Sequence, residues 1–258
     1  MTRHIPLEGI DNFRDFGGYG TRCGRGLKRG RLFRSANHAY ATEADLQALR
    51  DLGVQVIVDL RRRREREREP SRRWEDFAGA VIENDLDGVE TDWAEGLMAA
   101  TTIDANWFFQ DSLEFYRRAP HAERHVDLFR RYFHALAEAD GAVVVHCAAG
   151  KDRTGLVCAL THHIAGVHRD DTLADYLATN DETRMERRIA FLGPWIRDLT
   201  GRTLDDAALR QAVSVHEAFL EAAMDEIVSA HGTVEDYLED VLGIDARLRA
   251  GIEDRILG

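Results

Sequence analysis

The sequence predicts an α/β protein with a small, mostly parallel central sheet flanked by helices. Two segments, 54–60 and 142–146, are continuous apolar runs typical of strands that are buried on both faces. Helix-like stretches separate the strand-like segments, and this alternation favours βαβ units with parallel strands. The four expected strands are Arg31–Ala36, Val54–Leu60, Ala80–Leu86 and Ala142–His146.

The expected helices fall into three regions. Thr42–Leu52 begins at a favourable N-cap residue, has Asp45 three residues further on, and ends before Gly53. Residues 88–139 form a long insertion that we expect either to pack as ordinary helices or to fold over a site, and residues 156–258 are mainly helical. The insertion contains amphipathic stretches at Asn106–Arg118 and Glu123–Ala139, and later breaks are expected near Gly166, Gly193 with Pro194, Gly201, Gly232 and Gly243.

Length and composition fit one soluble domain spanning 1–258. The chain is 44% apolar and 31% charged, and no apolar run approaches the roughly 20 residues that a membrane helix needs, so we expect no stable membrane insertion. Residues 1–19 lack the layout of a signal peptide. The cytoplasm is therefore the expected location, with secretion by a route that needs no signal peptide left open.

The charge distribution bears on the ligand. A net charge of −12 disfavours binding to nucleic acid, but residues 1–73 contain 17 basic against 10 acidic residues, so this third attracts anions. Its most biased segment, Arg61–Arg73, reads first as a solvated, ion-paired helix start. The alternative is that its arginines rim an anion-binding cleft, because the segment leaves the C-terminal end of a strand.

The cysteine pattern points to a reduced thiol. The three cysteines, Cys23, Cys147 and Cys158, are far apart and form no Cys-x-x-Cys pair, which argues against a disulfide framework or a structural zinc site. Cys158 lies in an apolar helix and is expected to pack, and Cys23 in a turn is expected to be incidental. We expect no metal and no cofactor.

The segment 143–155 carries the chemistry. It reads as a buried strand, a loop of small residues, and a helix, with Cys147 at the strand end and Lys151 and Arg153 nearby. A helix N-terminus with adjacent basic groups favours the reactive thiolate. The five residues between Cys147 and Arg153 allow the loop to turn its backbone N–H groups toward one centre, where the helix dipole also favours an anion.

Each side chain of the loop has an expected role in phosphate chemistry. The planar fork of Arg153 can hold two phosphoryl oxygens, and Thr154 can hydrogen-bond the Cys147 sulfur. Attack by sulfur and later hydrolysis of the thiophosphate would divide one displacement into two steps, with no metal required. The predicted phosphate-binding residues are Ala148, Ala149, Gly150, Lys151, Asp152, Arg153 and Thr154.

A proton donor for the leaving oxygen is also needed. Asp152 is the first candidate, because a carboxyl group beside a phosphate dianion retains its proton more readily. Its alternative role is to stabilise the helix N-terminus. Asp59, at the end of the second strand, is the second candidate and Asp85 the third.

With these residues in hand, the sequence resembles the protein tyrosine phosphatase superfamily, whose signature of His-Cys, five residues, Arg and Ser/Thr is matched from His146 to Thr154. Within it the chain is similar to a bacterial atypical group of tyrosine and phosphoinositide phosphatases. The other segments that support this resemblance are Asn12–Tyr19, Gly30–Ala36, Asp59-Leu60-Arg61 with Glu65, and Asp175–Asn180.

The resemblance implies a cysteine-phosphatase fold, a nucleophile at Cys147, phosphate binding by Ala148 to Arg153, and a general acid at Asp152. Lys151 implies activity on phosphoinositides as well as on phosphotyrosine. Ala148 departs from the bulkier or basic residues of some relatives, which argues against a strong lipid preference. The implied partners are phosphorylated proteins or phosphoinositides, and the oligomeric state stays open.

Relatives in this group can cover the site with a helical lid, which we expect at Val89–Arg118. The aromatic residues of its underside would be Trp93, Trp107, Phe108 and Phe109, although aromatic residues at such spacing are more often ordinary core. A lid would exclude water from the reaction. The competing function is a pseudophosphatase that binds phosphorylated partners without turnover, and the joint presence of Cys147, Asp152 and Arg153 argues against it.

Overall fold

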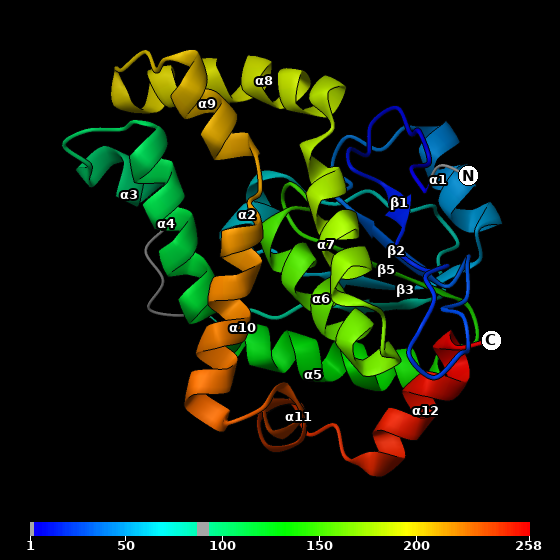
Figure 1. Ribbon diagram of the computed structural model, residues 1–258. Coiled ribbons are helices and arrows are strands. Elements are labelled where there is room, and N and C mark those ends of the chain that lie inside the picture. The colour runs from blue at the N-terminus through cyan, green and yellow to red at the C-terminus, as the bar shows by residue number, and fades with distance from the viewer. Residues whose placement is uncertain (1–2, 87–92) are drawn as a thin grey trace.

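The computed structural model describes residues 3–86 and 93–258. At its centre is a five-stranded sheet with the order β1-β2-β5-β3-β4, in which β1 is antiparallel and the others are parallel (Figure 1). The sequence-based prediction of a small, mostly parallel sheet is therefore confirmed. The strands are β1 Arg14–Asp15, β2 Leu32–Ser35, β3 Val54–Asp59, β4 Ala80–Ile82 and β5 Ala142–His146.

The strand ends position the site. β5 lies between β2 and β3, and His146 pairs with Ser35 on one side and with Asp59 on the other. The C-terminal ends of three parallel strands therefore meet at one edge of the sheet, where ligands bind in open α/β folds. The segment that begins with Cys147 leaves from this edge.

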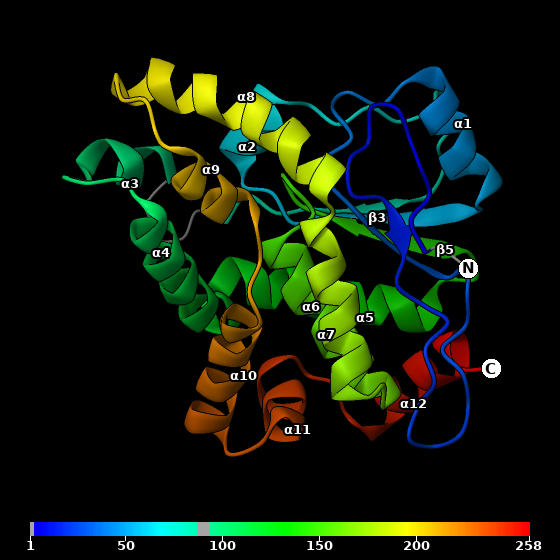
Figure 2. The same ribbon diagram turned by 45° about the horizontal axis from the view of Figure 1, so that its top comes forward.

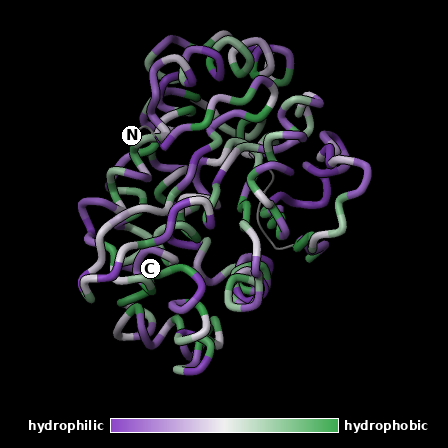
Figure 3. Tube along the Cα trace, turned by 90° about the vertical axis from the view of Figure 1, so that its right-hand side faces the viewer, coloured by the Kyte–Doolittle hydropathy of each residue, from purple (hydrophilic) through white to green (hydrophobic). Residues whose placement is uncertain are grey.

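The two faces of the sheet pack against different helices, because successive side chains along β5 point to opposite faces. Val143 and Val145 join a large core with α5, α6 and α12, whereas Val144 joins a smaller core with α1. Figure 3 shows hydrophilic and hydrophobic residues alternating along the turns of the outer helices. The helices are α1 Glu43–Asp51, α2 Arg63–Arg68, α3 Trp93–Ala99, α4 Ala105–Arg118, α5 Glu123–Glu138, α6 Asp152–Ala165, α7 Arg169–Leu177, α8 Glu182–Thr200, α9 Asp206–Val213, α10 Glu217–His231, α11 Val234–Asp236 and α12 Ala246–Ile256, with 3₁₀ turns at Ala119–His121 and Ala178–Asn180 and a π-helical turn at Tyr237–Val241.

Helix α1 shows how closely local chemistry predicts an element. The Thr42 side chain accepts from the N–H of Asp45, and the Asp45 carboxylate accepts from the N–H of Thr42, which completes a capping box. The same carboxylate also accepts from the N–H groups of Glu8 and Gly9. Asp45 therefore fixes the N-terminal loop as well as the helix.

A separate group of helices, α3, α4, α8 and α9, forms a wall beside the sheet edge (Figures 1 and 2). It has its own apolar core, which includes Leu97, Phe108, Leu192 and Ile196. The expected lid, Val89–Arg118, falls in this wall, and its first residues, 89–92, lie outside the described residues. No helix in the described parts of the chain is long and apolar enough to cross a bilayer.

The break expected near Gly193 and Pro194 is wrong, because α8 continues through both residues. A proline inside a helix removes one hydrogen bond and crowds the preceding turn, which normally costs about 3 kcal/mol. Here Leu192 and Ile196, on either side, are buried in the core shared with α9. Tertiary packing therefore holds the helix together. The other glycines behave as expected, since Gly166 and Gly201 end α6 and α8 in the left-handed conformation.

Candidate active site

The loop between β5 and α6 is shaped by one glycine. Gly150 has φ +63°, and a Cβ atom there would lie 2.4 Å from the backbone carbonyl of Ser35. No L-residue with a side chain fits this conformation and this space. The loop therefore runs directly against the end of β2 before α6 begins at Asp152.

The carbonyl groups of the loop point away from its centre, because each is held by a donor from another part of the chain. Two of these donors are buried side chains that reach the loop from the N-terminal segment and from β2. The Ala148 carbonyl accepts from Asn37, the Ala149 carbonyl from Asn12 and Arg184, and the Gly150 carbonyl from Asn12 and Arg34, at 2.9 to 3.2 Å.

The N–H groups of residues 148–153 are left free by this arrangement. None of them donates to another residue in the described part of the chain, whereas the carbonyls of 148–150 are all engaged. Since a peptide unit points the C=O of one residue and the N–H of the next in opposite directions, the outward carbonyls of residues 148–150 leave the N–H groups of residues 149–151 facing the inside of the loop. Free N–H groups at a helix N-terminus form a ready anion-binding site.

Two buried arginines behind the loop share one carboxylate. Asp175, on α7, accepts from Arg14 at 3.2 Å and from Arg34 at 2.6 Å, and all three side chains are almost completely buried. Burial alone would raise the pKa of Asp175, but Arg14 and Arg34 outweigh it and keep the pKa well below its usual range. This cluster holds Arg34 against the loop carbonyls. Sequence reasoning assigned it no role, although Asp175 stood in a segment that carried the family resemblance.

Arg153 lies where the signature predicts and is held by Glu65 of α2. Its two terminal nitrogens donate to the two carboxylate oxygens at 2.6 and 2.7 Å, and Nη1 also donates to the Leu60 carbonyl at 3.2 Å. Burial would raise the pKa of Glu65, but the Arg153 guanidinium outweighs it and lowers the pKa to about 2. Glu65 therefore stays ionised and fixes the direction of the guanidinium.

Asp152 is the first residue of α6 and lines the same cleft as Arg153. Its Oδ1 accepts from the Tyr116 hydroxyl at 3.2 Å, and its Oδ2 lies 3.5 Å from the ammonium of Lys151. Lys151 is largely buried and donates to the carbonyls of Ala212 and Ser214 at the end of α9. Its ammonium is thus committed to the helical wall.

The two other candidate acids are bound elsewhere. Asp59 is buried and accepts from Arg61 through both oxygens, at 2.8 to 3.2 Å, and lies 3.7 Å from His146. Burial would raise its pKa, but His146 and Arg61 outweigh it and keep the pKa well below the usual range, which disfavours a protonated donor. Asp85 is exposed and pairs with Arg66.

Cys147 directly precedes the loop and is 2% exposed, and Thr154, in the first turn of α6, is fully buried. The Thr154 hydroxyl has no hydrogen-bond partner among the described residues, so the predicted bond to the Cys147 sulfur is not formed in this state. Burial raises the pKa of the Cys158 thiol to about 12, which fits its expected packing role. Cys23 is exposed.

A cleft of about 880 Å³ opens above the loop. Arg62, Arg64 and Arg68 from the biased segment line it, together with Arg187 and Arg188 of α8. Both interpretations of that segment hold in part: α2 is an exposed, ion-paired helix, and three of the arginines line a cleft. The position of the segment at the end of β3 explains why they line it. Anion binding by these arginines stays a prediction.

An aromatic wall faces these arginines. Trp93 stacks on Trp195 with ring centres 5.7 Å apart, and Phe108, Phe115 and Phe191 also line the cleft. Of the aromatic residues expected on the underside of a lid, Trp93 and Phe108 line the cleft. The other two pack elsewhere: Trp107 joins the core of the helical wall, and Phe109 contacts Phe219 of α10 at 5.0 Å.

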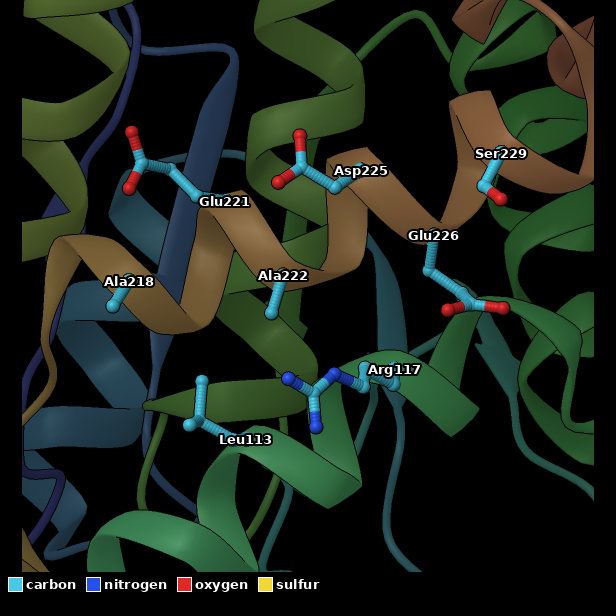
Figure 4. A pocket seen from close by; sticks show the side chains of 8 residues that line it. All are labelled: Leu113, Arg117, Ala218, Glu221, Ala222, Asp225, Glu226 and Ser229. Carbon is cyan, nitrogen blue, oxygen red and sulfur yellow. The ribbon is translucent and has the colours of Figure 1, made fainter.

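A second hollow, of about 390 Å³, lies between α4 and α10 (Figure 4). Its lining comes from two helices: Leu113 and Arg117 of α4, and Ala218, Glu221, Ala222, Asp225, Glu226 and Ser229 of α10. Its charged lining residues are three carboxylates and one arginine. The larger cleft, whose lining includes Arg153 and the arginines of α2 and α8, is the better place for an anionic substrate.

The fold, taken together with the family and the relatives that the chain matches, defines an enzyme that hydrolyses phosphoric monoesters. The model of the tyrosine phosphatase family matches residues 5–258, and the chain belongs to this family. A Cupriavidus necator protein assigned to the tyrosine-protein phosphatases is 32% identical over 252 residues, covering 96% of this chain and 88% of that protein. The triple specificity protein phosphatase PtpB of Mycobacterium tuberculosis is 30% identical, covering 91% of this chain and 92% of its own, and a tyrosine-protein phosphatase of Nostoc commune is also 30% identical, covering 81% and 68%.

Proposed function

We propose that this phosphatase hydrolyses phosphotyrosine through a phosphocysteine intermediate on Cys147. The observation that supports it most directly is the outward direction of the carbonyls of residues 148–150, which leaves the loop N–H groups for the substrate. A phosphoryl group in this loop would receive backbone donors on its equatorial oxygens. Charge accumulates on those oxygens in the transition state, so fixed donors lower the barrier.

In the first step the Cys147 thiolate attacks phosphorus, an S–P bond forms, and the bond from phosphorus to the ester oxygen breaks. Asp152 gives its proton to the departing oxygen and becomes a carboxylate. Arg153, oriented by Glu65, binds two phosphoryl oxygens. In the second step Asp152 takes a proton from water as the water oxygen attacks phosphorus. The S–P bond then breaks and releases inorganic phosphate and the thiolate.

The cleft favours an aromatic phosphate. Its aromatic wall, with Trp93 stacked on Trp195, offers a surface for a phenyl ring. The arginines that line the cleft would attract further anionic groups of a substrate. The mycobacterial relative is named as a triple specificity protein phosphatase. We therefore extend the proposal to phosphoserine, phosphothreonine and phosphoinositides as additional substrates, with phosphotyrosine as the main one.

Lys151 contributes little to a lipid preference in this proposal. Its ammonium donates to Ala212 and Ser214, which takes it away from the loop centre. We assign to α3 and α4 the role of a lid over the cleft, since both supply lining residues. Deletion of 90–118 would change substrate access if the assignment is correct.

The test combines a variant with an inhibitor. Cys147→Ser should abolish hydrolysis of an aryl phosphate while the protein stays folded, and vanadate should inhibit the wild-type enzyme whereas a chelator should not. Cys158→Ser serves as the matched control, because that thiol is also buried but plays no chemical part. Activity that persists in Cys147→Ser, or that a chelator removes, would refute the mechanism. A panel of phosphotyrosine, phosphoserine and phosphothreonine peptides and phosphoinositides then measures the substrate range.

A further inference from the structure

Two buried tyrosines form a hydrogen-bonded chain that ends on Asp152. The hydroxyl groups of Tyr176 on α7 and Tyr116 on α4 are 2.7 Å apart, and the Tyr116 hydroxyl donates to Asp152 Oδ1 at 3.2 Å. Tyr116 is 0% exposed and Tyr176 is 1% exposed. Neither hydroxyl has access to bulk water, so each must find its partners inside the protein.

The chain is rigid because both rings are packed. Tyr116 stacks on Phe219 with ring centres 5.7 Å apart. Tyr176 lies against α6, where a Cβ atom at Gly155 would come within 2.8 Å of its ring. Glycine directly after the signature therefore allows Tyr176 to approach the start of α6 and reach Tyr116.

The direction of the hydrogen bonds follows from the number of protons. An ionised carboxylate only accepts hydrogen bonds, so Tyr116 must donate its single proton to Asp152. The Tyr116 oxygen can then only accept from Tyr176. While Tyr116 donates to Oδ1, Oδ2 is the oxygen left to take up a proton.

We propose that the Tyr176–Tyr116 chain positions Asp152 and makes Oδ2 the oxygen that carries and transfers the proton. Tyr116 and Tyr176 are positioning residues, since they act through Asp152. This inference rests on the proposed role of Asp152 as the general acid. It adds that a residue of the helical wall, Tyr116 of α4, holds the Asp152 carboxyl group in position.

The other charged and titratable groups that face Asp152 come from three elements. Lys151 and Arg153 flank it on the loop and α6, and Lys151 is 3.5 Å from Oδ2. Asp111 of α4 and Arg184 of α8 line the same cleft and interact electrostatically with Asp152. Tyr116→Phe leaves all four in place, so the variant isolates the hydroxyl.

The experiment measures kcat/KM for a series of aryl phosphates with good to poor leaving groups, across pH, for Tyr116→Phe and the wild type. A donor to a carboxylate favours its ionised form, so we expect loss of the Tyr116 hydroxyl to move the basic limb of the profile to higher pH. We expect kcat/KM for poor leaving groups to fall about tenfold, because a mispositioned acid keeps only part of its roughly 10²- to 10⁴-fold contribution. Good leaving groups, which need little protonation, should change much less.

Tyr132→Phe is the matched control. Tyr132 is fully buried, and its hydroxyl pairs at 2.9 Å with Thr161, which follows Asp152 by nine residues in α6. Its pH profile and its dependence on leaving group should match the wild type. Tyr176→Phe should shift the profile in the same direction as Tyr116→Phe, by a smaller amount, since it weakens the chain at its far end.

The outcomes separate this inference from the proposed function. In an Asp152→Asn background, Tyr116→Phe should have no further effect. If Asp152→Asn slows poor leaving groups but Tyr116→Phe and Tyr176→Phe both behave like the wild type, the tyrosine chain is overturned and the acid stands. If Asp152→Asn slows poor and good leaving groups equally, Asp152 is not the general acid, and the proposed role of the tyrosine chain is overturned as well.

Discussion

Glu65 holds Arg153 by a two-pronged contact, with both carboxylate oxygens within 2.7 Å of the guanidinium nitrogens. The two residues come from α2 and α6, which lie on opposite sides of the loop in the sequence. A flexible side chain with many rotamers is thereby fixed before any substrate arrives. The cost of ordering Arg153 is met during folding and not during binding.

Glu65→Gln should lower kcat/KM for aryl phosphates by about 10- to 100-fold, since small errors in the position of a binding group have effects of this size. The amide keeps the volume of the side chain but cannot hold the guanidinium through two charged oxygens. Steady-state kinetics will measure the fall in kcat/KM, and the affinity for vanadate provides a second measurement. Glu67→Gln, on the exposed side of the same helix, is the control and should leave both values unchanged. Wild-type kinetics in Glu65→Gln would contradict the positioning role.

The same pair should contribute to stability in a defined pH range. The pKa of Glu65 falls from 4.5 to about 2 on folding, which corresponds to about 3 kcal/mol. Because the folded-state pKa is the lower one, this contribution is fully present above about pH 4.5 and is lost as the pH falls toward 2. Urea unfolding of the wild type and Glu65→Gln at pH 7, 5, 4 and 3 should show a difference that narrows with acid. A difference that stays constant across these pH values would show that the ion pair is not its source.

Asp175→Asn should destabilise the fold strongly. It leaves Arg14 and Arg34 buried next to each other without the carboxylate that balances them, and breaking a buried pair in this way costs about 3 to 5 kcal/mol. Chemical denaturation at pH 7 gives the value. Asp140→Asn is the control, since that carboxylate is exposed and its pair with Arg255 should be worth less than about 1 kcal/mol.

Gly150→Ala should eliminate activity, because the new Cβ would lie 2.4 Å from the Ser35 backbone at a positive φ angle. The loop can relieve this contact only by turning its carbonyls, which disturbs the N–H groups on the inside. Gly243→Ala provides the comparison, since Gly243 has a similar φ of +69° in open space and should cost about 1 kcal/mol with activity retained. Full activity in Gly150→Ala would mean that the loop adapts without loss.

Much of the fold was predictable because its signals are local. The apolar runs that form β3 and β5, the N-cap at Thr42 and the loop that follows His146 all depend on neighbouring residues. The two-residue strand β1 was not expected, since Arg14 and Asp15 are too few to show an alternating pattern. The expected strand Ala80–Leu86 is shorter, ending at Ile82.

The candidate site was predictable in its centre and not in its supports. Cys147 and Arg153 belong to one short segment, so their spacing can be seen in the sequence. The Lys151 ammonium, in contrast, donates to the carbonyls of Ala212 and Ser214, some sixty residues later. The pairing of Arg34 with Asp175 likewise joins distant segments. Contacts of this kind depend on how elements dock, which local pattern does not specify.

The anchoring of the loop carbonyls limits how far this enzyme can be shortened. Asn12 attaches the loop to the N-terminal segment, Arg184 attaches it to α8, and Lys151 attaches it to the end of α9. A fragment that ends after α7 would retain the complete signature sequence but would lose two of these three contacts, those made by Arg184 and by Lys151. A unit that keeps all three contacts therefore extends at least from Asn12 to Ser214, far beyond the signature motif.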